Sequence, residues 1–123
     1  KDVGYAIQFD STENDTMSLS LMGTQLFEQD SEFFNKTKGL ILEHGFTEWR
    51  HHPYTDTMVL KERFNFACLN FAAGYYNYHT DNEYVIVEDV LNSTLLGESV
   101  IKELGNEFYE FKVPKKDSFG WFD

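Results

Sequence analysis

The sequence contains only one cysteine, Cys68, and that residue lies in an apolar run. A single cysteine cannot form an intramolecular disulfide, so a disulfide-stapled secreted domain is excluded and a reducing, cytoplasmic compartment is favoured. Cysteine zinc motifs and phosphate-binding glycine loops are also absent. No apolar run approaches the roughly 20 residues of a membrane-spanning helix, and none has the pattern of a signal peptide.

Basic residues are scarce as well. Lysine and arginine together number 10, against 21 aspartates and glutamates, which gives a net charge of −11 at pH 7. Such a charge repels nucleic acids and anionic membranes, so we expect neither as a partner. The same charge suits a soluble protein or one that gathers cations.

What the chain does contain is typical of a folded domain. Its 123 residues are 41% hydrophobic and 17% aromatic, which is enough for a modest core but small for a complete enzyme. The chain starts at Lys1 rather than Met and enters a strand-like run within two residues. We therefore expect it to be part of a larger protein.

The apolar runs predict a partial mixed or parallel sheet in an α/β domain. Val3–Phe9 reads as a buried strand and Phe64–Phe71 as a central strand beside or near it. Met17–Met22 alternates as a half-buried strand does, and Phe46–Trp49 reads as a short strand.

Helices are predicted to cover this sheet. Ser31 is a capping residue for a helix over Ser31–His44, and a second helix is expected from Tyr84 to Leu104. A short helix is predicted over Thr57–Arg63. The domain is expected to span residues 1–105, and the aromatic tail of residues 106–123 should pack on it or on a partner.

Two positions stand out as candidate site residues. Asp10 follows the first strand, where it is either a turn former or a functional carboxylate, since ligands bind beyond the carboxyl ends of strands in open α/β sheets. His79 follows the Gly74 loop and could be a metal ligand, a general base or a loop residue bonded to backbone. Glu83, Glu88 and Asp89 lie close behind it.

Other polar residues are weaker candidates. His51 and His52 are adjacent on an extended stretch and should face different directions, so they cannot easily share one metal ion. Asp56, with Thr55, is placed to cap the short predicted helix.

Four motifs occur in an order that resembles a known family: Ile7-Gln8-Phe9-Asp10, Tyr54-Thr55-Asp56, Phe66-Ala67-Cys68-Leu69-Asn70 and His79-Thr80. In this order they resemble the carboxy-terminal half of co-catalytic di-zinc aminopeptidases, of the zinc exopeptidase superfamily. Leu69–Thr80 is similar to the version in bacterial and phage peptidases. The resemblance runs from about Val3 to Leu104 and places His79-Thr80 at the opening of the last helix.

The resemblance implies a role for three residues. Asp10 would bind one zinc ion, His79 the other, and Asp56 would lie beside the site as a supporting residue. Around the position of Asp56, family members commonly have Ser-Asp-His, whereas this chain has Thr55-Asp56-Thr57. The family's His-x-Asp pair, bridging Asp and Glu-Glu pair are not among these residues, so a missing amino-terminal half or a partner chain would have to supply them.

Two functions are therefore expected. The first is the carboxy-terminal portion of a zinc-dependent exopeptidase-like hydrolase, which acts on a peptide or amide substrate and is inactive as this chain alone. The alternative is a non-catalytic protein-interaction module that retains the peptidase-like fold. An oligomer is compatible with both.

Overall fold

The computed structural model describes residues 3–21, 23–52, 63 and 65–112, and it has a mixed α/β fold. The sheet strands are β1 (Tyr5–Ser11), β2 (Thr16–Leu21), β3 (Thr24–Gln25), β4 (Glu48–His52) and β5 (Ala67–Ala72). A small two-stranded sheet contains β6 (Tyr75–Tyr76) and β7 (Tyr84–Val85), and the helices are α1 (Glu32–Glu43) and α3 (Val87–Leu104). Most of the predicted helix Thr57–Arg63 lies outside the described residues.

The five-stranded sheet is mixed rather than parallel. Its strand order is β1-β5-β2-β3, and β4 pairs with β2 on a branch of this path. β1 and β5 run parallel, from the pair Tyr5 and Ala67 to the pair Phe9 and Phe71, which confirms that the two most apolar runs are neighbours. β2 runs antiparallel to β5 and parallel to β4.

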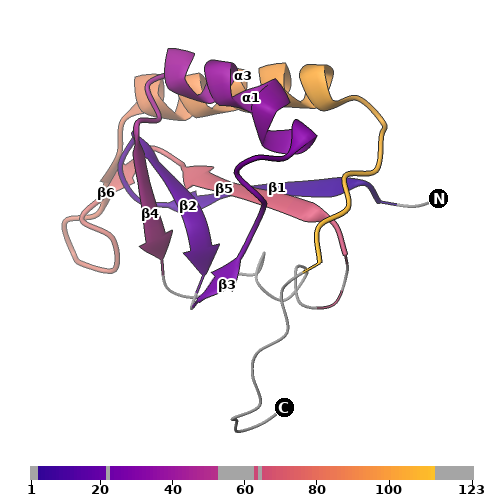
Figure 1. Ribbon diagram of the computed structural model, residues 1–123. Coiled ribbons are helices and arrows are strands. Elements are labelled where there is room, and N and C mark those ends of the chain that lie inside the picture. The colour runs from indigo at the N-terminus through magenta and orange to yellow at the C-terminus, as the bar shows by residue number, and fades with distance from the viewer. Residues whose placement is uncertain (1–2, 22, 53–62, 64, 113–123) are drawn as a thin grey trace, which may run out of the picture.

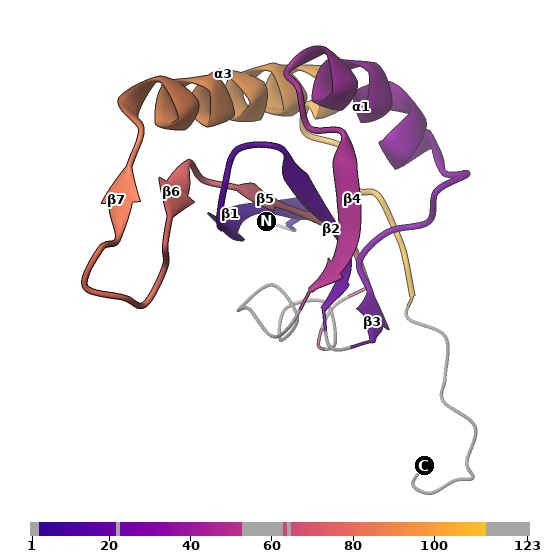
Figure 2. The ribbon, with the colours of Figure 1, turned by 90° about the vertical axis from the view of Figure 1, so that its left-hand side faces the viewer.

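Both helices lie over the same face of this sheet, as two perpendicular views of the ribbon agree (Figure 1 and Figure 2). α1 begins as predicted, because the Ser31 hydroxyl accepts a hydrogen bond from the Phe34 amide at 3.3 Å. The end of α1 is tied to α3, where Asn92 Nδ2 donates to His44 O at 2.8 Å. The prediction that two helices cover the sheet is confirmed for these residues.

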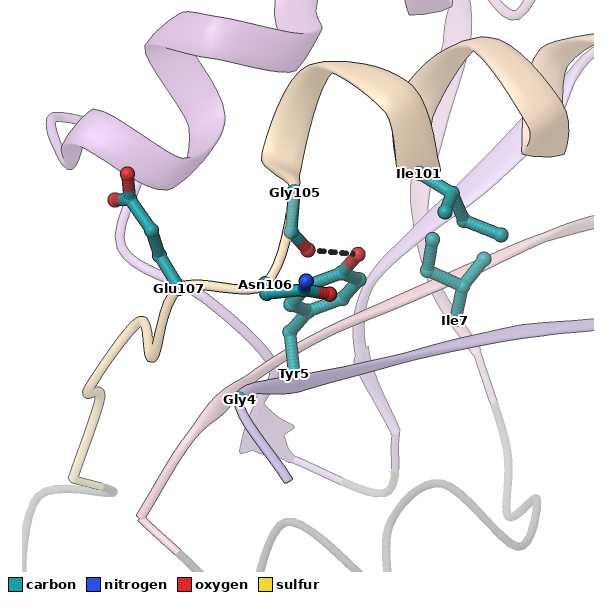
Figure 3. A pocket seen from close by; sticks show the side chains of 7 residues that line it. All are labelled: Gly4, Tyr5, Ile7, Ile101, Gly105, Asn106 and Glu107. Carbon is teal, nitrogen blue, oxygen red and sulfur yellow. Dashed lines mark hydrogen bonds between the residues drawn. The ribbon is translucent and has the colours of Figure 1, made fainter. Parts of the chain in front are cut away.

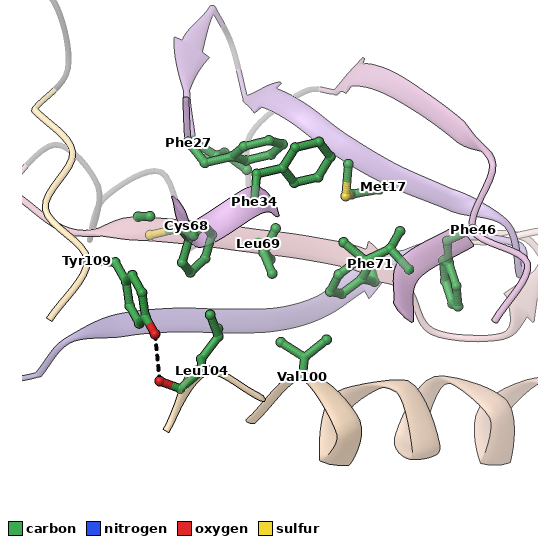
Figure 4. Packing of buried hydrophobic residues seen from close by; sticks show 14 of the residues in the cluster. Met17, Phe27, Phe34, Phe46, Cys68, Leu69, Phe71, Val100, Leu104 and Tyr109 are labelled. Atoms are coloured by element: carbon green, nitrogen blue, oxygen red, sulfur yellow. Dashed lines mark hydrogen bonds between the residues drawn. The ribbon is translucent and has the colours of Figure 1, made fainter. Parts of the chain in front are cut away.

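The hydrophobic core fills the layer between the sheet and the helices (Figure 4). The rings of Phe46 and Phe71 meet edge to face at 5.4 Å, and those of Phe34 and Trp49 meet at 5.3 Å. The largest fully buried side chains are Phe27, Phe33, Phe34, Phe46, Phe71, Met17, Leu21, Leu26, Ile41, Leu69 and Leu96. Each contributes about 1.5–3 kcal/mol by leaving water, so these aromatic contacts hold the sheet on its helices.

Two burial predictions were wrong. β1 was expected to be buried, but it is the end strand of its sheet and Tyr5–Phe9 are half-buried. β2 was expected to be half-buried, but both of its faces are covered, and Ser18 is as inaccessible as Met17. Strand alternation alone cannot show which strands have neighbours on both sides, because that depends on pairing between distant segments.

Residues 106–112 return to the domain. Tyr109 is buried, its ring meets those of Tyr5 and Phe33, and its hydroxyl donates to Leu104 O at 2.7 Å. Residues 113–123 lie outside the described part of the chain. Neither of the described helices has the combination of length and apolar character that a membrane crossing requires.

Candidate functional site

Asp10 occupies a β-bulge at the carboxyl end of β1. Phe9 pairs with Phe71 and Ser11 pairs with Ala72, so Asp10 is the extra residue with no partner on β5. Its side chain is exposed. Bulges re-aim the side chain at the end of a strand and are common next to active sites. The bulge thus presents the Asp10 carboxylate to solvent at the carboxyl edge of the sheet.

The loops that follow β1 and β5 run side by side at this edge. The Ala73 amide donates to Ser11 O at 2.8 Å, the Gly74 amide to Glu13 O at 2.8 Å, and the Glu13 amide to Tyr75 O at 2.7 Å. Gly74 has φ +92°, and a Cβ added there would lie 2.8 Å from Val90 N. Only glycine fits this turn, so the backbone of the second loop is fixed against both the first loop and α3.

His79 lies on the turn of the β6–β7 hairpin, not at the opening of a helix as the resemblance placed it. The last helix begins at Val87, after β7. His79 has φ +64°, a conformation uncommon for residues other than glycine. Its ring stacks on Tyr78 with 4.1 Å between ring centres and 14° between planes. The turn is closed by Thr80, whose hydroxyl donates to Asn77 O at 2.5 Å.

The hairpin is anchored to the start of α3. Tyr76 stacks on Tyr84 across the hairpin, and its hydroxyl donates to Asp89 Oδ2. Asn14 Nδ2, from the loop after β1, donates to Asp89 Oδ1 at 3.3 Å. Burial raises the pKa of Tyr76, and the hydrogen bond and charge of Asp89 raise it further, so the phenol stays protonated as the donor. Asp89 therefore joins the hairpin, the first loop and the helix.

Tyr75, in β6, contacts both the loop after β1, through its backbone carbonyl, and the turn that carries His79, through its ring. Its ring is 5.8 Å from that of Tyr78, which stacks on His79. The pKa of Tyr75 is raised, first by burial and then by the negative charge of Asp10. Glu83 acts on it in the same way. The structure thus brings Asp10 and the His79 hairpin to one edge of the sheet, around Tyr75.

The pair does not make a complete metal site. Across the described ranges of the chain, no group of three or more His, Cys, Asp and Glu side chains is placed to hold a metal ion. Among the described residues, the His79 ring stacks on Tyr78 and makes no hydrogen bond. Asp56, the predicted supporting residue, lies outside the described residues.

A polar cluster behind Asp10 was missed by the sequence reasoning. Asn70, at the centre of β5, donates from Nδ2 to Ser11 Oγ at 3.1 Å and to Ser18 Oγ at 2.9 Å. Ser18 Oγ is 2.6 Å from His52 Nδ1. Asn70 Oδ1 is buried and has no hydrogen-bond partner within the described structure. These hydrogen bonds link Ser11, the residue after Asp10, to β2 and β4.

The two histidines of β4 have the same kind of partner. His51 Nδ1 is 2.6 Å from Ser20 Oγ, and His52 Nδ1 is 2.6 Å from Ser18 Oγ. Burial lowers the pKa of His52, and the charges of Arg50 and His51 lower it further. One feature of the sequence could have pointed to these pairs: serine alternates with Met17, Leu19 and Leu21, which puts Ser18 and Ser20 on one face of β2. Both histidines bond serine, and His52 is linked through Ser18 and Asn70 to Ser11, the residue after Asp10.

Comparison with known proteins adds no identification. The chain matches no protein-family model, no curated protein and no solved structure.

Proposed function

We propose that this chain is the carboxy-terminal portion of a zinc-dependent exopeptidase-like hydrolase, an aminopeptidase or related amide hydrolase. The observation that carries the proposal is the shared edge: bulged Asp10 and the His79 hairpin follow two neighbouring parallel strands, and three backbone hydrogen bonds join their loops. A cytoplasmic location is part of the proposal.

The residue types fit zinc. A carboxylate oxygen and an imidazole nitrogen are ordinary zinc ligands, with bonds of about 2.0–2.2 Å. Two zinc ions roughly 3.5–4 Å apart activate a water molecule and polarise a peptide carbonyl. With Asp10 on one ion and His79 on the other, the carboxylate and a ring nitrogen should lie within about 8 Å of each other. Tyr78 would hold the His79 ring in place through the stack of their rings.

The remaining ligands and the general base would come from a missing amino-terminal half or a partner chain. Asp10 and His79 give each ion a single protein ligand, whereas stable sites use three or four. The 123-residue chain alone should therefore show no hydrolysis of amino-acid anilides above background with added zinc. Strong metal-dependent turnover by this chain would contradict the assignment of its ligands.

Metal titration followed by NMR tests the pairing directly. Paramagnetic Co²⁺, a substitute for zinc, should broaden the signals of Asp10 and His79 together at the lowest metal concentrations. Asp10→Asn and His79→Gln should each weaken this effect. His44→Gln is the matched control, because His44 Nδ1 is 2.8 Å from Leu40 O at the end of α1 and is not part of the edge. Broadening at only one of the two residues would contradict a shared site.

The alternative is a non-catalytic protein-interaction module with the same fold. One observation favours it: α3 leaves large apolar side chains exposed, among them Val87 and Leu91. The same Co²⁺ titration separates the two functions, since a module without a metal site should show no selective broadening at the edge.

A further inference from the structure

Two serine–histidine pairs lie next to each other where β2 and β4 run side by side. Ser20 is the direct partner of His51 in the register of these strands, and Ser20 Oγ is 2.6 Å from His51 Nδ1. Ser18 Oγ is likewise 2.6 Å from His52 Nδ1. A hydroxyl at about 2.6–3.2 Å from an imidazole nitrogen is the arrangement that activates a serine as a nucleophile. Both pairs have this distance, so access from solvent decides which of them can react.

Access differs between the two serines. Ser18 is completely buried, and its Oγ also accepts a hydrogen bond from Asn70 Nδ2 at 2.9 Å. Ser20 is 6% exposed and lines a hollow of about 330 Å³, which the exposed His51 lines as well. A ligand that enters this hollow therefore meets the Ser20–His51 pair, whereas the Ser18 hydroxyl is inaccessible to it.

The same hollow contains amide and apolar groups. Gln25 and Gln29 line it, and Gln25 Nε2 donates to Phe27 O at 3.2 Å. A side-chain amide nitrogen has two hydrogens, so Gln25 keeps one for a second acceptor. Such amides are among the groups that stabilise the oxyanion of an acyl transfer. Leu19 and Phe27 add an apolar surface, so the hollow combines a nucleophile, a base, a hydrogen-bond donor and an apolar wall.

The hydroxyls that line the two larger hollows beside α3 are bonded to backbone carbonyls instead. In the hollow of about 750 Å³, the Tyr5 hydroxyl donates to Gly105 O at 2.9 Å (Figure 3). In the hollow of about 690 Å³, the hydroxyls of Ser93 and Thr94 each donate to a backbone carbonyl at 2.9 Å. A carbonyl oxygen does not take up a hydroxyl proton as an imidazole does. The smaller hollow on β2 and β4 is therefore the stronger candidate for chemistry.

We propose that Ser20 is the nucleophile and His51 the general base of an acyl-transfer site that hydrolyses short, uncharged carboxylic esters. The volume of the hollow is near the lower limit of small-molecule sites, about 300–1,000 Å³, so the acyl group must be short. The net charge of −11 repels anionic substrates. The cross-strand register holds the nucleophile against its base, as a third residue does in a catalytic triad. The inference does not rest on the zinc hydrolase proposed for Asp10 and His79.

The reaction has two steps. Ser20 Oγ attacks the carbonyl carbon of the ester, and its proton passes to His51 Nδ1 of an imidazole that carries its own proton on Nε2. The carbonyl oxygen becomes an oxyanion beside the Gln25 amide, and when the carbonyl re-forms, the alcohol leaves with the proton from His51. Water then attacks the acyl-serine. His51 takes the proton of the water and returns it to Ser20 Oγ, and the carboxylic acid is released.

Para-nitrophenyl acetate, added to the 123-residue chain, is the probe. We expect release of para-nitrophenolate above background and, in protein quenched early, an acetyl group on Ser20 located by peptide mass spectrometry. His51→Gln should slow the release by about tenfold or more, because the general base is lost. His51 is exposed, so this substitution should leave the fold intact. His52→Gln is the matched control and should change the rate by less than about twofold, since its partner Ser18 is buried.

Three results would overturn the site: no release above background, acetyl groups on lysines but not on Ser20, or equal slowing by His51→Gln and His52→Gln. Ser20→Ala should remove the acetyl group, and mapping on the unsubstituted chain decides the question where a substitution disturbs folding. EDTA should leave the release unchanged, and loss of activity in EDTA would assign it to a metal ion instead. The zinc hydrolase fails separately, since its own test is the broadening by Co²⁺ at Asp10 and His79.

Discussion

Asn70 allows a stability prediction that can be worked from its contacts. Asn70→Ala removes two donated hydrogen bonds, each worth about 0.5–1.5 kcal/mol, and leaves a cavity that costs about 1 kcal/mol more. It also removes the unpartnered Oδ1, whose burial already costs the native protein about 1–3 kcal/mol. The free energy of unfolding should therefore fall by about 1 kcal/mol. Asn70→Leu loses the same two hydrogen bonds and the same unpartnered oxygen, but the leucine side chain fills the space. Its cost should therefore be about 1 kcal/mol lower than that of Asn70→Ala.

Asn70→Asp should be the most damaging of the three. It replaces the two N–H donors of Asn70 with a second acceptor and buries a charge, at a cost of about 3 kcal/mol or more. Urea unfolding at pH 7 measures all three, with Thr94→Val as a surface control expected to change stability by less than about 0.5 kcal/mol. The reasoning is refuted if Asn70→Leu is as damaging as Asn70→Asp, because Oδ1 would then have had a partner to lose.

Two further outcomes follow from the same structure. Because burial lowers the pKa of His52 from 6.5, the unfolded chain binds a proton below about pH 6.5 that the folded chain resists, so stability should fall as the pH drops from about 7 to 5. His52→Gln should flatten part of that slope in urea titrations, and an unchanged slope would show that the histidine is not protected. Gly74→Ala should cost about 2 kcal/mol or more, because it combines φ +92° with a Cβ 2.8 Å from Val90 N. Gly23→Ala, at φ +82° with open space around its Cβ, should cost only the backbone strain, and equal thermal shifts in both variants would contradict the clash.

The features predicted correctly from the sequence were those with a local signal. Ser31 caps α1 with its own hydroxyl, and the uncharged runs Val3–Phe9 and Phe64–Phe71 marked β1 and β5 as strands. α3 gave no such signal, since its first residue follows Ile86, whose side chain makes no capping bond. The helix was therefore predicted to begin at Tyr84, and the short strand β7 was missed. Two-residue strands such as β6 and β7 have too little alternation to be recognised from sequence.

The residues of the candidate site also differ in whether they have a local signal in the sequence. Asp10 was singled out because it directly follows the predicted strand Val3–Phe9, and His79 because it follows the loop at Gly74; both remain predictions as site residues. The cluster around Asn70 could not be found, because its contacts to Ser11 and Ser18 join residues 59 and 52 positions away along the chain. Within its own apolar run, Asn70 carries no sign of these partners. Contacts of this kind depend on strand register, which the chain fixes only when the whole sheet has formed.

Asp10 and His79 are held in different ways, and the difference bears on how a metal would be bound. Asp10 lies between Phe9, fixed in register with Phe71 in the core, and Ser11, fixed by the side chain of Asn70. His79 is held on an exposed turn by one ring stack and by the bonds of Thr80. A ligand on a rigid strand sets the geometry of a site, whereas a ligand on a turn adjusts to it. Metal binding should therefore order the hairpin and leave β1 unchanged, because the folded chain already holds the backbone of Asp10 in place before a metal binds.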